Sequence, residues 1–332
     1  MDAFIAEYAK PNKPVIITDV VTKWPAYKKW TMDYLVEKWG DVVFRAEAID
    51  IKLREYARYA ANSNMDESPL YLFDKNFAEK CYGIENDYSV PEYFAEDFFK
   101  VLDKNRPDYR WLIIGPSRAG STFHKDPNST SAWNAVITGS KKWIMYPPNI
   151  LPPGVFTSDD EAEVTSPISL MEWHLNFYKE AQRSHPRPLE GVCQAGEIIF
   201  VPNGWWHMVV NLEDSIAITQ NFVGTHNLLN VLCFLRDKPD QISGFGNSFE
   251  NCRDIYKTFR EAFRERYQGV LEKIELENER KFVNKNNPIK STWDKIKNNE
   301  NGNENSEVKK FSFNFEFEDS NDDSNNDVDK RR

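Results

Sequence analysis

The sequence predicts a mainly β fold with flanking helices, in which short strands close into a barrel-like double sheet. Three observations support this. Runs rich in β-branched and aromatic residues recur between residues 109 and 222, with turn residues between them. Several of these runs alternate polar with apolar side chains, which suits a sheet that closes on a polar interior. Aromatic residues make up 14% of the 332 residues, enough for a sizeable core. Together these features favour the jelly-roll or cupin architecture.

Residues 1–108 are expected to form an N-terminal α/β segment that supports this core. Thr31 is a plausible N-cap for one of its helices. Helical patterns are found at 4–9, 31–39, 53–61 and 91–102. Strand patterns are found at 14–19, 42–49 and 69–74.

Residues 109–225 are expected to form the β core. A turn at Gly139 separates strands at 133–137 and 141–146. A helical insertion at 169–182 divides the core into two halves. The second half has strands at 198–201, 207–212 and 215–222.

The remaining residues predict a helical region at 226–296 and an acidic disordered tail at 297–332. A first helix is expected at 228–237 and a long amphipathic one at 252–279. The apolar stripe of the long helix could pack on the barrel or on a second subunit. The alternating run 311–318 in the tail could be a strand, a docking peptide or an unstructured segment.

Charge and cysteine content narrow the function classes. The formal net charge of −10 argues against nucleic-acid binding through a basic surface and suits a Lys/Arg-rich protein partner. The four cysteines form no C-x-x-C pair, which is typical of reduced thiols in an intracellular compartment. No signal peptide and no apolar run long enough to span a membrane are found, so the nucleus or cytoplasm is expected.

His124 and Asp126 form an H-x-D pair, and His207 follows much later, after two tryptophans. Side chains two apart on an extended segment point to the same face, so the imidazole and the carboxylate are presented together. A histidine from a distant strand would complete a 2-His-1-carboxylate set, which non-haem Fe(II) oxygenases use. An H-x-D pair alone is a weak signal and could be a hydrogen-bonded loop pair.

The wider pattern resembles the JmjC-domain oxygenases that depend on Fe(II) and 2-oxoglutarate, and among them the JMJD6 (arginine demethylase and lysyl-hydroxylase) type. The similar segments are SPLYLFD at 68–74, YRWLIIGP at 109–116, HKDPNSTSAWNA at 124–135, KKW at 141–143 and PNGWWHMVVNLEDSIAITQNF at 202–222. The resemblance implies a double-stranded β-helix core that uses Fe(II), 2-oxoglutarate and O2. It also implies that His124, Asp126 and His207 are the catalytic metal ligands.

Lys141 is the candidate cation for the distal carboxylate of 2-oxoglutarate. It shares a strand face with Trp143 and Met145, whereas Lys142 lies on the other face. A solvated turn lysine is the alternative. The resemblance implies that Tyr71 and Thr219 hydrogen-bond the same carboxylate. It also places Asn134, and less directly Asn221, near the metal and cofactor.

Trp111, Arg118, Ser121 and Lys125 are expected around the substrate mouth. Lys125 lies between two proposed ligands and would repel a cationic substrate unless it points away. The resemblance implies peptidyl-lysine hydroxylation or N-methyl-arginine or N-methyl-lysine demethylation, and lysyl hydroxylation is favoured. It also implies a homodimer formed through the C-terminal helices.

Two other functional classes remain open for this chain. A non-catalytic JmjC-fold scaffold would serve protein interactions, but the loss of a ligand is its expected signature and all three ligands are present. A cupin isomerase that uses zinc or manganese would require a richer His/Glu set than this chain offers.

Overall fold

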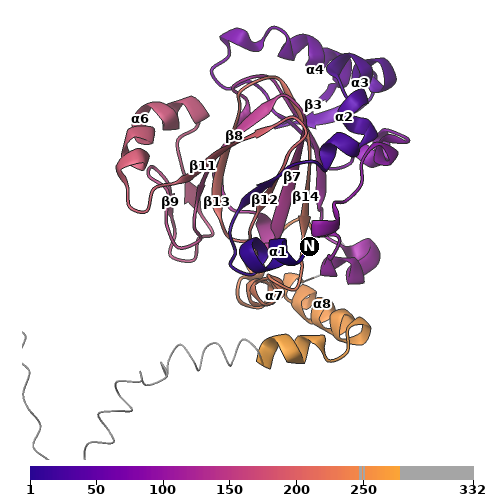
Figure 1. Ribbon diagram of the computed structural model, residues 1–332, viewed down its shortest axis with the longest axis vertical. Coiled ribbons are helices and arrows are strands. Elements are labelled where there is room, and N and C mark those ends of the chain that lie inside the picture. Colours follow the sequence, from indigo (N-terminus) through magenta and orange to yellow (C-terminus); the bar gives the residue numbers. More distant parts are fainter. Residues whose placement is uncertain (247–248, 250, 277–332) are drawn as a thin grey trace, which may run out of the picture. The chain divides into compact units, whose positions relative to one another are not determined.

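The protein is built around two facing β-sheets. The structure, a computed structural model, describes residues 1–246, 249 and 251–276. Figure 1 shows the two sheets side by side, with helices around them and at one end. The larger sheet has the strand order β1-β12-β7-β14-β5-β4-β2-β3, and the smaller has the order β11-β8-β13-β6. This arrangement confirms the predicted mainly β fold with flanking helices.

All strand pairs of the two sheets are antiparallel, and several join segments that are far apart in sequence. β1 pairs with β12, for example, so residues 15–17 extend a sheet whose centre is formed by residues 131–138 and 215–222. The larger sheet consists of β1 (Val15–Ile17), β2 (Val43–Ala46), β3 (Ile49–Lys52), β4 (Leu72–Asp74), β5 (Arg110–Gly115), β7 (Ser131–Thr138), β12 (Ile198–Val201) and β14 (Ser215–Phe222). The smaller sheet consists of β6 (Gly120–His124), β8 (Ser140–Tyr146), β11 (Leu189–Gln194) and β13 (Trp206–Asn211).

The N-terminal helices cover the outer face of the larger sheet. Outward-facing Trp133, Phe200 and Phe222 pack with apolar side chains of these helices in one buried cluster. Thr31 caps one helix as predicted, because its hydroxyl accepts from the Tyr34 amide at 3.1 Å. The helical elements are α1 (Asp2–Phe4), η1 (Ile5–Ala9), η2 (Val21–Lys23), α2 (Pro25–Lys29), α3 (Met32–Trp39), α4 (Leu53–Ala60), η3 (Ser63–Met65), α5 (Phe77–Lys80), η4 (Ile84–Asp87) and η5 (Glu92–Phe94).

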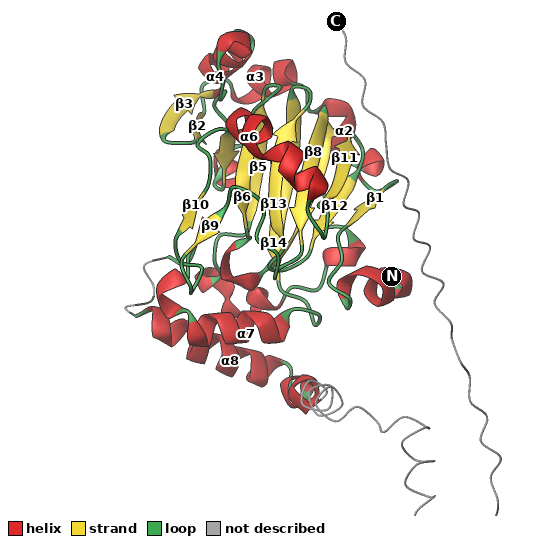
Figure 2. Ribbon diagram, turned by 90° about the vertical axis from the view of Figure 1, so that its left-hand side faces the viewer, coloured by secondary structure: helices red, strands yellow, loops and turns green. Residues whose placement is uncertain are grey.

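The predicted insertion is helix α6 (Leu170–Arg183), and it covers the outer face of the smaller sheet. Figure 2 shows α6 in front of β8 and β11. Trp173 of α6 packs with Phe123 and Tyr146, which face outward from β6 and β8. Each sheet therefore buries its outer face under helices, and the inner faces of the two sheets are left to form the site.

The C-terminal helices α7 (Leu228–Asp237) and α8 (Cys252–Arg266) lie at one end of the sheets (Figure 2). The apolar stripe of α8 packs within the chain, against α7 and the 3-10 segment η6 (Phe98–Asn105). Phe259 and Phe263 are fully buried there, and each such side chain contributes roughly 1.5–3 kcal/mol by leaving water. A short turn, η8 (Pro239–Gln241), follows α7.

Two predicted elements are divided in the structure. The strand expected at 42–49 is a hairpin of β2 and β3, because Glu47 adopts a left-handed backbone (φ 48°) and reverses the chain. The helix expected at 91–102 is two 3-10 segments. Asp97 is extended between them, and its carboxylate accepts from the Phe99 and Val223 amides and pairs with Arg106.

Two further differences concern the core and the C-terminal region. The long helix expected at 252–279 ends at Arg266, and Gly269 follows in the left-handed region (φ 74°), which glycine tolerates. Strand β11 was not predicted, because LEGVCQ lacks a clear alternation of apolar and polar residues. The predicted tail 297–332 lies outside the described residues, as does the end of the 226–296 region. Within the described part of the chain, no helix is long and apolar enough to cross a membrane.

Candidate metal centre and cofactor pocket

His124 and His207 are direct neighbours across two antiparallel strands. His124 ends β6 and His207 lies near the start of β13, and the two residues are paired in the sheet register. Their ring centroids are 4.2 Å apart. Ligand atoms of His124, Asp126 and His207 all lie within 4.8 Å of one another. The three residues predicted from sequence therefore come together in one cluster.

Backbone carbonyls orient both imidazole rings. His124 Nδ1 lies 2.7 Å from the Thr122 carbonyl, and His207 Nδ1 lies 3.0 Å from the Trp205 carbonyl. A carbonyl can only accept, so each Nδ1 carries the proton and each Nε2 keeps its lone pair. Burial lowers the pKa of His207 well below its ordinary value, and the neighbouring His124 lowers it further. The neutral form that binds a metal is thereby favoured.

Asp126 supplies a carboxylate with one oxygen that no group in the described part of the chain contacts by a hydrogen bond. Its Oδ2 is buried and has no hydrogen-bond partner among the described residues. Burial raises the pKa of Asp126, while His124 and the Asn221 side chain act against this. A buried, unpartnered carboxylate oxygen beside two imidazole lone pairs fits a divalent cation with open coordination positions.

Lys141 lies on the inner face of β8 and is 0% exposed. Its ammonium donates to the Tyr71 hydroxyl at 2.9 Å and to Asn211 Oδ1 at 2.6 Å. Burial lowers the pKa of Lys141 to about 7. Lys142 faces outward and pairs with Glu190 at 2.8 Å, so the predicted strand register is confirmed. Among the described residues, no carboxylate lies within ion-pair distance of Lys141, and its surroundings fit an anionic ligand.

Asn211 was not predicted as a site residue. It is paired with Lys141 in the β13–β8 register, and it shares the inner face of β13 with His207. Its Nδ2 also donates to the Gly115 carbonyl at 3.1 Å, so its amide orientation is fixed and Oδ1 is directed at Lys141. Asn211 is separated from His207 by an even number of positions, so the sequence places both side chains on the same strand face. This spacing points to a site residue only once the pairing of β13 with β8 is known.

Asn134, Thr219 and Asn221 line the inner face of the larger sheet. Thr219 is paired with Asn134 on one side and with Trp111 on the other. Its hydroxyl donates to the Trp133 carbonyl at 2.9 Å. Asn134 Oδ1 is buried without a partner among the described residues. Asn221 donates to the Thr130 hydroxyl at 2.8 Å. The predicted cofactor residues of the larger sheet therefore face the same interior. At least one of their polar atoms, Asn134 Oδ1, has no hydrogen-bond partner among the described residues.

Of the four residues expected at the mouth, Lys125 is the one that lines the cavity at the metal centre. A cavity of about 620 Å3 opens at the metal centre, and Lys125 lines it together with His124 and Asp126. Arg118 instead donates to the Ser63 and Asp66 carbonyls of the N-terminal segment. Trp111 and Ser121 are also absent from the cavity lining, and Trp111 packs on Phe73 at a ring distance of 5.4 Å.

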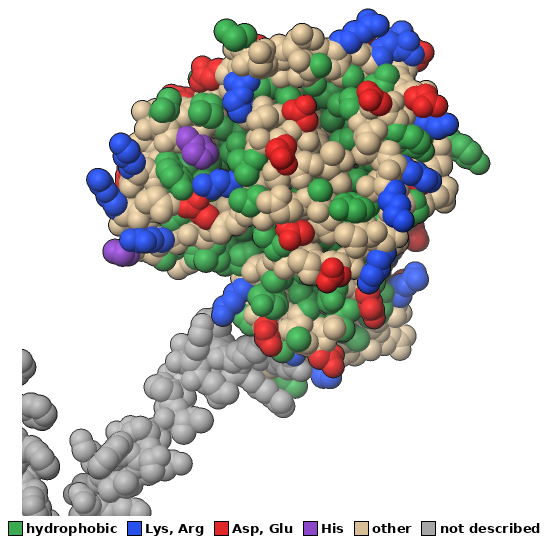
Figure 3. All heavy atoms as spheres, turned by 45° about the horizontal axis from the view of Figure 1, so that its top comes forward, with side chains coloured by type: hydrophobic (Ala, Val, Ile, Leu, Met, Phe, Trp, Pro, Cys, Tyr) green, Lys and Arg blue, Asp and Glu red, His purple; other side chains and the backbone are tan. Residues whose placement is uncertain are grey.

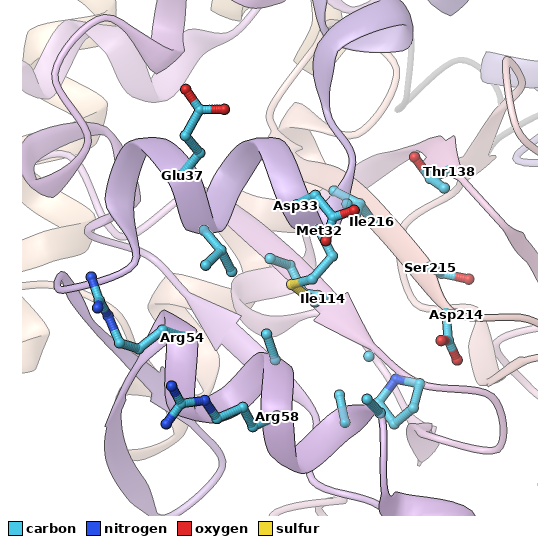
Figure 4. Close-up of a pocket in the computed structure, with 16 residues that line it drawn as sticks. Met32, Asp33, Glu37, Arg54, Arg58, Ile114, Thr138, Asp214, Ser215 and Ile216 are labelled. Carbon is cyan, nitrogen blue, oxygen red and sulfur yellow. The ribbon is translucent and has the colours of Figure 1, made fainter.

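A second cavity, of about 750 Å3, lies away from the metal centre. Figure 4 shows it between helices α3 and α4 and the ends of β5, β7 and β14. It shares no lining residue with the cavity at the metal centre. Ile114 and Gly115 form part of its lining, and the Gly115 carbonyl accepts from Asn211. The two cavities are therefore distinct.

Comparison with known proteins agrees with this geometry. The profile of the cupin-like domain family matches residues 1–226. The chain belongs to the cupin-like family. The match takes in the three clustered residues, both sheets and helix α6, and it ends just before α7. The predicted cupin core is thereby confirmed.

Several curated relatives carry oxygenase or demethylase names. The arginine-specific demethylase JMJ22 of Arabidopsis thaliana is 50% identical over 83% of this chain and 54% of its own length. The bifunctional arginine demethylase and lysyl-hydroxylase psr-1 of Caenorhabditis elegans is 37% identical over 69% of this chain and 60% of its own length. The 2-oxoglutarate and iron-dependent oxygenase JMJD4 of Homo sapiens is 30% identical over 71% of this chain and 62% of its own length.

These relatives confirm the resemblance to JmjC-domain oxygenases, including the bifunctional demethylase and hydroxylase type. This cupin-like chain spans about half the length of the first of them.

Proposed function

We propose that this chain is a dioxygenase that depends on Fe(II) and 2-oxoglutarate and acts on protein side chains. One observation carries the proposal: a fully buried ammonium, Lys141, shares the interior of a barrel with a carboxylate and two imidazoles that have free ligand atoms. The cluster offers a place for a metal, and the ammonium offers a place for an acid. 2-Oxoglutarate needs both, since it chelates the metal at one end and carries a carboxylate at the other.

The site residues have distinct roles in this proposal. His124, Asp126 and His207 hold Fe(II). Lys141 pairs with the distal carboxylate of 2-oxoglutarate, and the Tyr71 hydroxyl donates to the same group. The Thr219 hydroxyl also donates to it after turning away from the Trp133 carbonyl. Asn134 and Asn221 provide amide groups beside the metal, and Asn134 Oδ1 is unused in the structure. When bound, Fe(II) and 2-oxoglutarate supply the activation of O2 that inserts oxygen into a substrate C–H bond. The protein orients these groups.

The proposed substrate is a lysine or an N-methylated arginine or lysine in a basic protein. The names of JMJ22 and psr-1 support this class. Hydroxylation of a lysine carbon leaves a stable alcohol, whereas hydroxylation of an N-methyl carbon leaves a product that releases formaldehyde. Of the two we favour lysyl hydroxylation, and the product analysis decides between them.

The net charge of −10 would attract a basic protein at long range. On the face shown in Figure 3, however, acidic and basic side chains are interspersed and neither forms a continuous patch. Selection is therefore expected at the mouth of the site. A homodimer formed through the C-terminal helices and a location in the nucleus or cytoplasm stay predictions.

A non-catalytic scaffold is the competing function, and one experiment separates the two. Anaerobic titration of the full chain with Fe(II) and then 2-oxoglutarate should show stoichiometric binding of each. On admission of O2, succinate release should rise when a Lys/Arg-rich peptide panel is added. Binding of the metal without O2-dependent succinate release on any peptide would favour the scaffold.

A further inference from the structure

Lys125 presents an electrostatic problem for a basic substrate. It lies between the metal-cluster residues His124 and Asp126 and lines the cavity that opens onto them. An uncompensated ammonium at this place would repel a cationic side chain approaching the metal centre. The structure shows how this charge is neutralised.

Glu161 holds the Lys125 ammonium. Both carboxylate oxygens of Glu161 lie 2.9 Å from Lys125 Nζ, and the Pro148 carbonyl accepts from the same ammonium at 3.3 Å. Lys125 Nζ also lies over the Trp206 ring, 4.7 Å from its centroid. The three acceptor contacts match the three donors of the ammonium, so none is left for a substrate.

Strand pairing and contacts with the C-terminal helical region hold the segment that carries Glu161 in place. It is the tip of a small hairpin formed by β9 (Phe156–Thr157) and β10 (Val164–Thr165). The Asp160 carbonyl accepts from Lys238 Nζ at 2.6 Å and from Gln241 Nε2 at 3.1 Å, which attaches the tip to the end of α7 and to η8. Glu161 itself adopts a left-handed backbone (φ 59°), an unfavourable conformation for a non-glycine residue that such contacts can maintain.

With Lys125 neutralised, the mouth favours cations. Glu161, Asp237 and Asp240 line the cavity besides Asp126, against the ammonium groups of Lys125 and Lys238. Among the described residues, Asp240 has no ion-pair partner, whereas Asp237 pairs with Arg236. Asp240 is therefore available to a positively charged substrate side chain.

We propose that Glu161 is a specificity-determining residue, which neutralises Lys125 so that the metal centre admits a cationic side chain. This inference rests on the proposed function for its substrate class, a lysine or methylated arginine side chain. It predicts a particular pattern of peptide affinities. Loss of the Glu161 carboxylate should weaken peptide binding, whereas loss of the Lys125 ammonium should not. In a variant that lacks both charges, the affinity should return.

The test measures binding rather than turnover. Fluorescence anisotropy of a short labelled Lys/Arg-rich peptide would give its affinity for the full chain loaded with metal and 2-oxoglutarate. Glu161→Gln should weaken binding on the order of tenfold, since Lys125 loses its carboxylate partner close to the metal centre and Lys238 loses the same carboxylate at 3.9 Å. Glu163→Gln is the matched control: it removes the same charge from the same hairpin, and Glu163 makes no side-chain contact with Lys125. It should change affinity by less than about twofold.

Two further variants distinguish an effect of charge on peptide binding from an effect of the ion pair on the position of the hairpin. Lys125→Gln alone should bind the peptide as well as the wild type or better, and Lys125→Gln/Glu161→Gln should regain most of the affinity. Equal losses in Glu161→Gln and Glu163→Gln would overturn the inference. So would a loss in Lys125→Gln as large as that in Glu161→Gln, because the ion pair would then act by holding the hairpin. A lack of succinate release with this binding pattern intact would overturn the proposed function alone.

Discussion

Lys141 Nζ lies 2.6 Å from Asn211 Oδ1, its neighbour across β8 and β13, inside a barrel where both side chains are buried. The Tyr71 hydroxyl accepts a second hydrogen bond at 2.9 Å. These two neutral acceptors satisfy two of the three donors of this ammonium without balancing its charge. In the proposed function, this pair marks one end of the 2-oxoglutarate site, and the His–Asp–His cluster marks the other.

Replacing Lys141 with alanine should weaken 2-oxoglutarate binding on the order of a hundredfold or more. The ligand carboxylate would be buried without its counter-charge, which typically costs about 3–5 kcal/mol. Isothermal titration calorimetry of the metal-loaded protein would measure the change. Lys142→Ala is the matched control, because Lys142 faces outward toward Glu190. If Lys142→Ala destroyed binding and Lys141→Ala did not, the assignment of the cofactor pocket would be wrong.

Binding of 2-oxoglutarate should take up a proton above neutral pH. Burial lowers the pKa of Lys141 from its ordinary value of 10.5 to about 7, so the ligand-free amine is largely neutral at higher pH. A bound carboxylate favours the charged ammonium and raises that pKa again. Affinity should therefore fall as pH rises above about 7, by up to roughly tenfold per pH unit.

Calorimetry at about pH 8, in buffers that differ in ionisation enthalpy, would measure this uptake as nearly one proton per ligand. Lys141→Met should abolish it. An equal uptake in the wild type and in Lys141→Met would contradict the assigned proton acceptor.

Local patterns in the sequence predicted much of the site. The H-x-D pair and the alternation around Lys141 predicted which side chains face inward, and the structure places them so. Asn211 escaped prediction because its role depends on the pairing of β13 with β8, a non-local relationship. Glu161 escaped because no local pattern links it to Lys125, and only the folded hairpin brings the two side chains together.

The same contrast holds for the fold. The core strands at 198–201 and 215–222 follow from their residues alone. The division of 91–102 follows from the contacts of Asp97 with Val223 and Arg106, which no local pattern contains.

Gly115→Ala should impair 2-oxoglutarate binding without touching the metal ligands. A Cβ at this position would lie 2.5 Å from Tyr71 Cδ2 and 2.8 Å from Asn211 Nδ2, so both partners of Lys141 must shift. We expect an affinity loss of about tenfold and a destabilisation of about 1–3 kcal/mol. Gly191→Ala is the control, since its nearest atom, Ile16 Cδ1, is 3.4 Å away. Equal behaviour of the two variants in calorimetry and thermal unfolding would refute this view of Gly115.

His207→Ala should abolish turnover and metal binding while folding is largely retained. A metal that binds only the folded protein raises its melting temperature, so Fe(II) or Mn(II) should stabilise the wild type and not this variant. His185→Ala, at an exposed histidine, should keep both the stabilisation and the activity. The metal assignment fails if His207→Ala still shows the full metal-dependent rise in a thermal shift assay.

The most direct test of the central claim is mass spectrometry of a basic peptide panel after incubation with the full chain, Fe(II), 2-oxoglutarate and O2. The account predicts the gain of one oxygen atom on a lysine side chain, with one succinate released per modification. Formaldehyde release with loss of a methyl group would keep the oxygenase assignment and change the favoured reaction to demethylation. Turnover restricted to acidic or non-peptide compounds, or no O2-dependent succinate at all, would contradict the account.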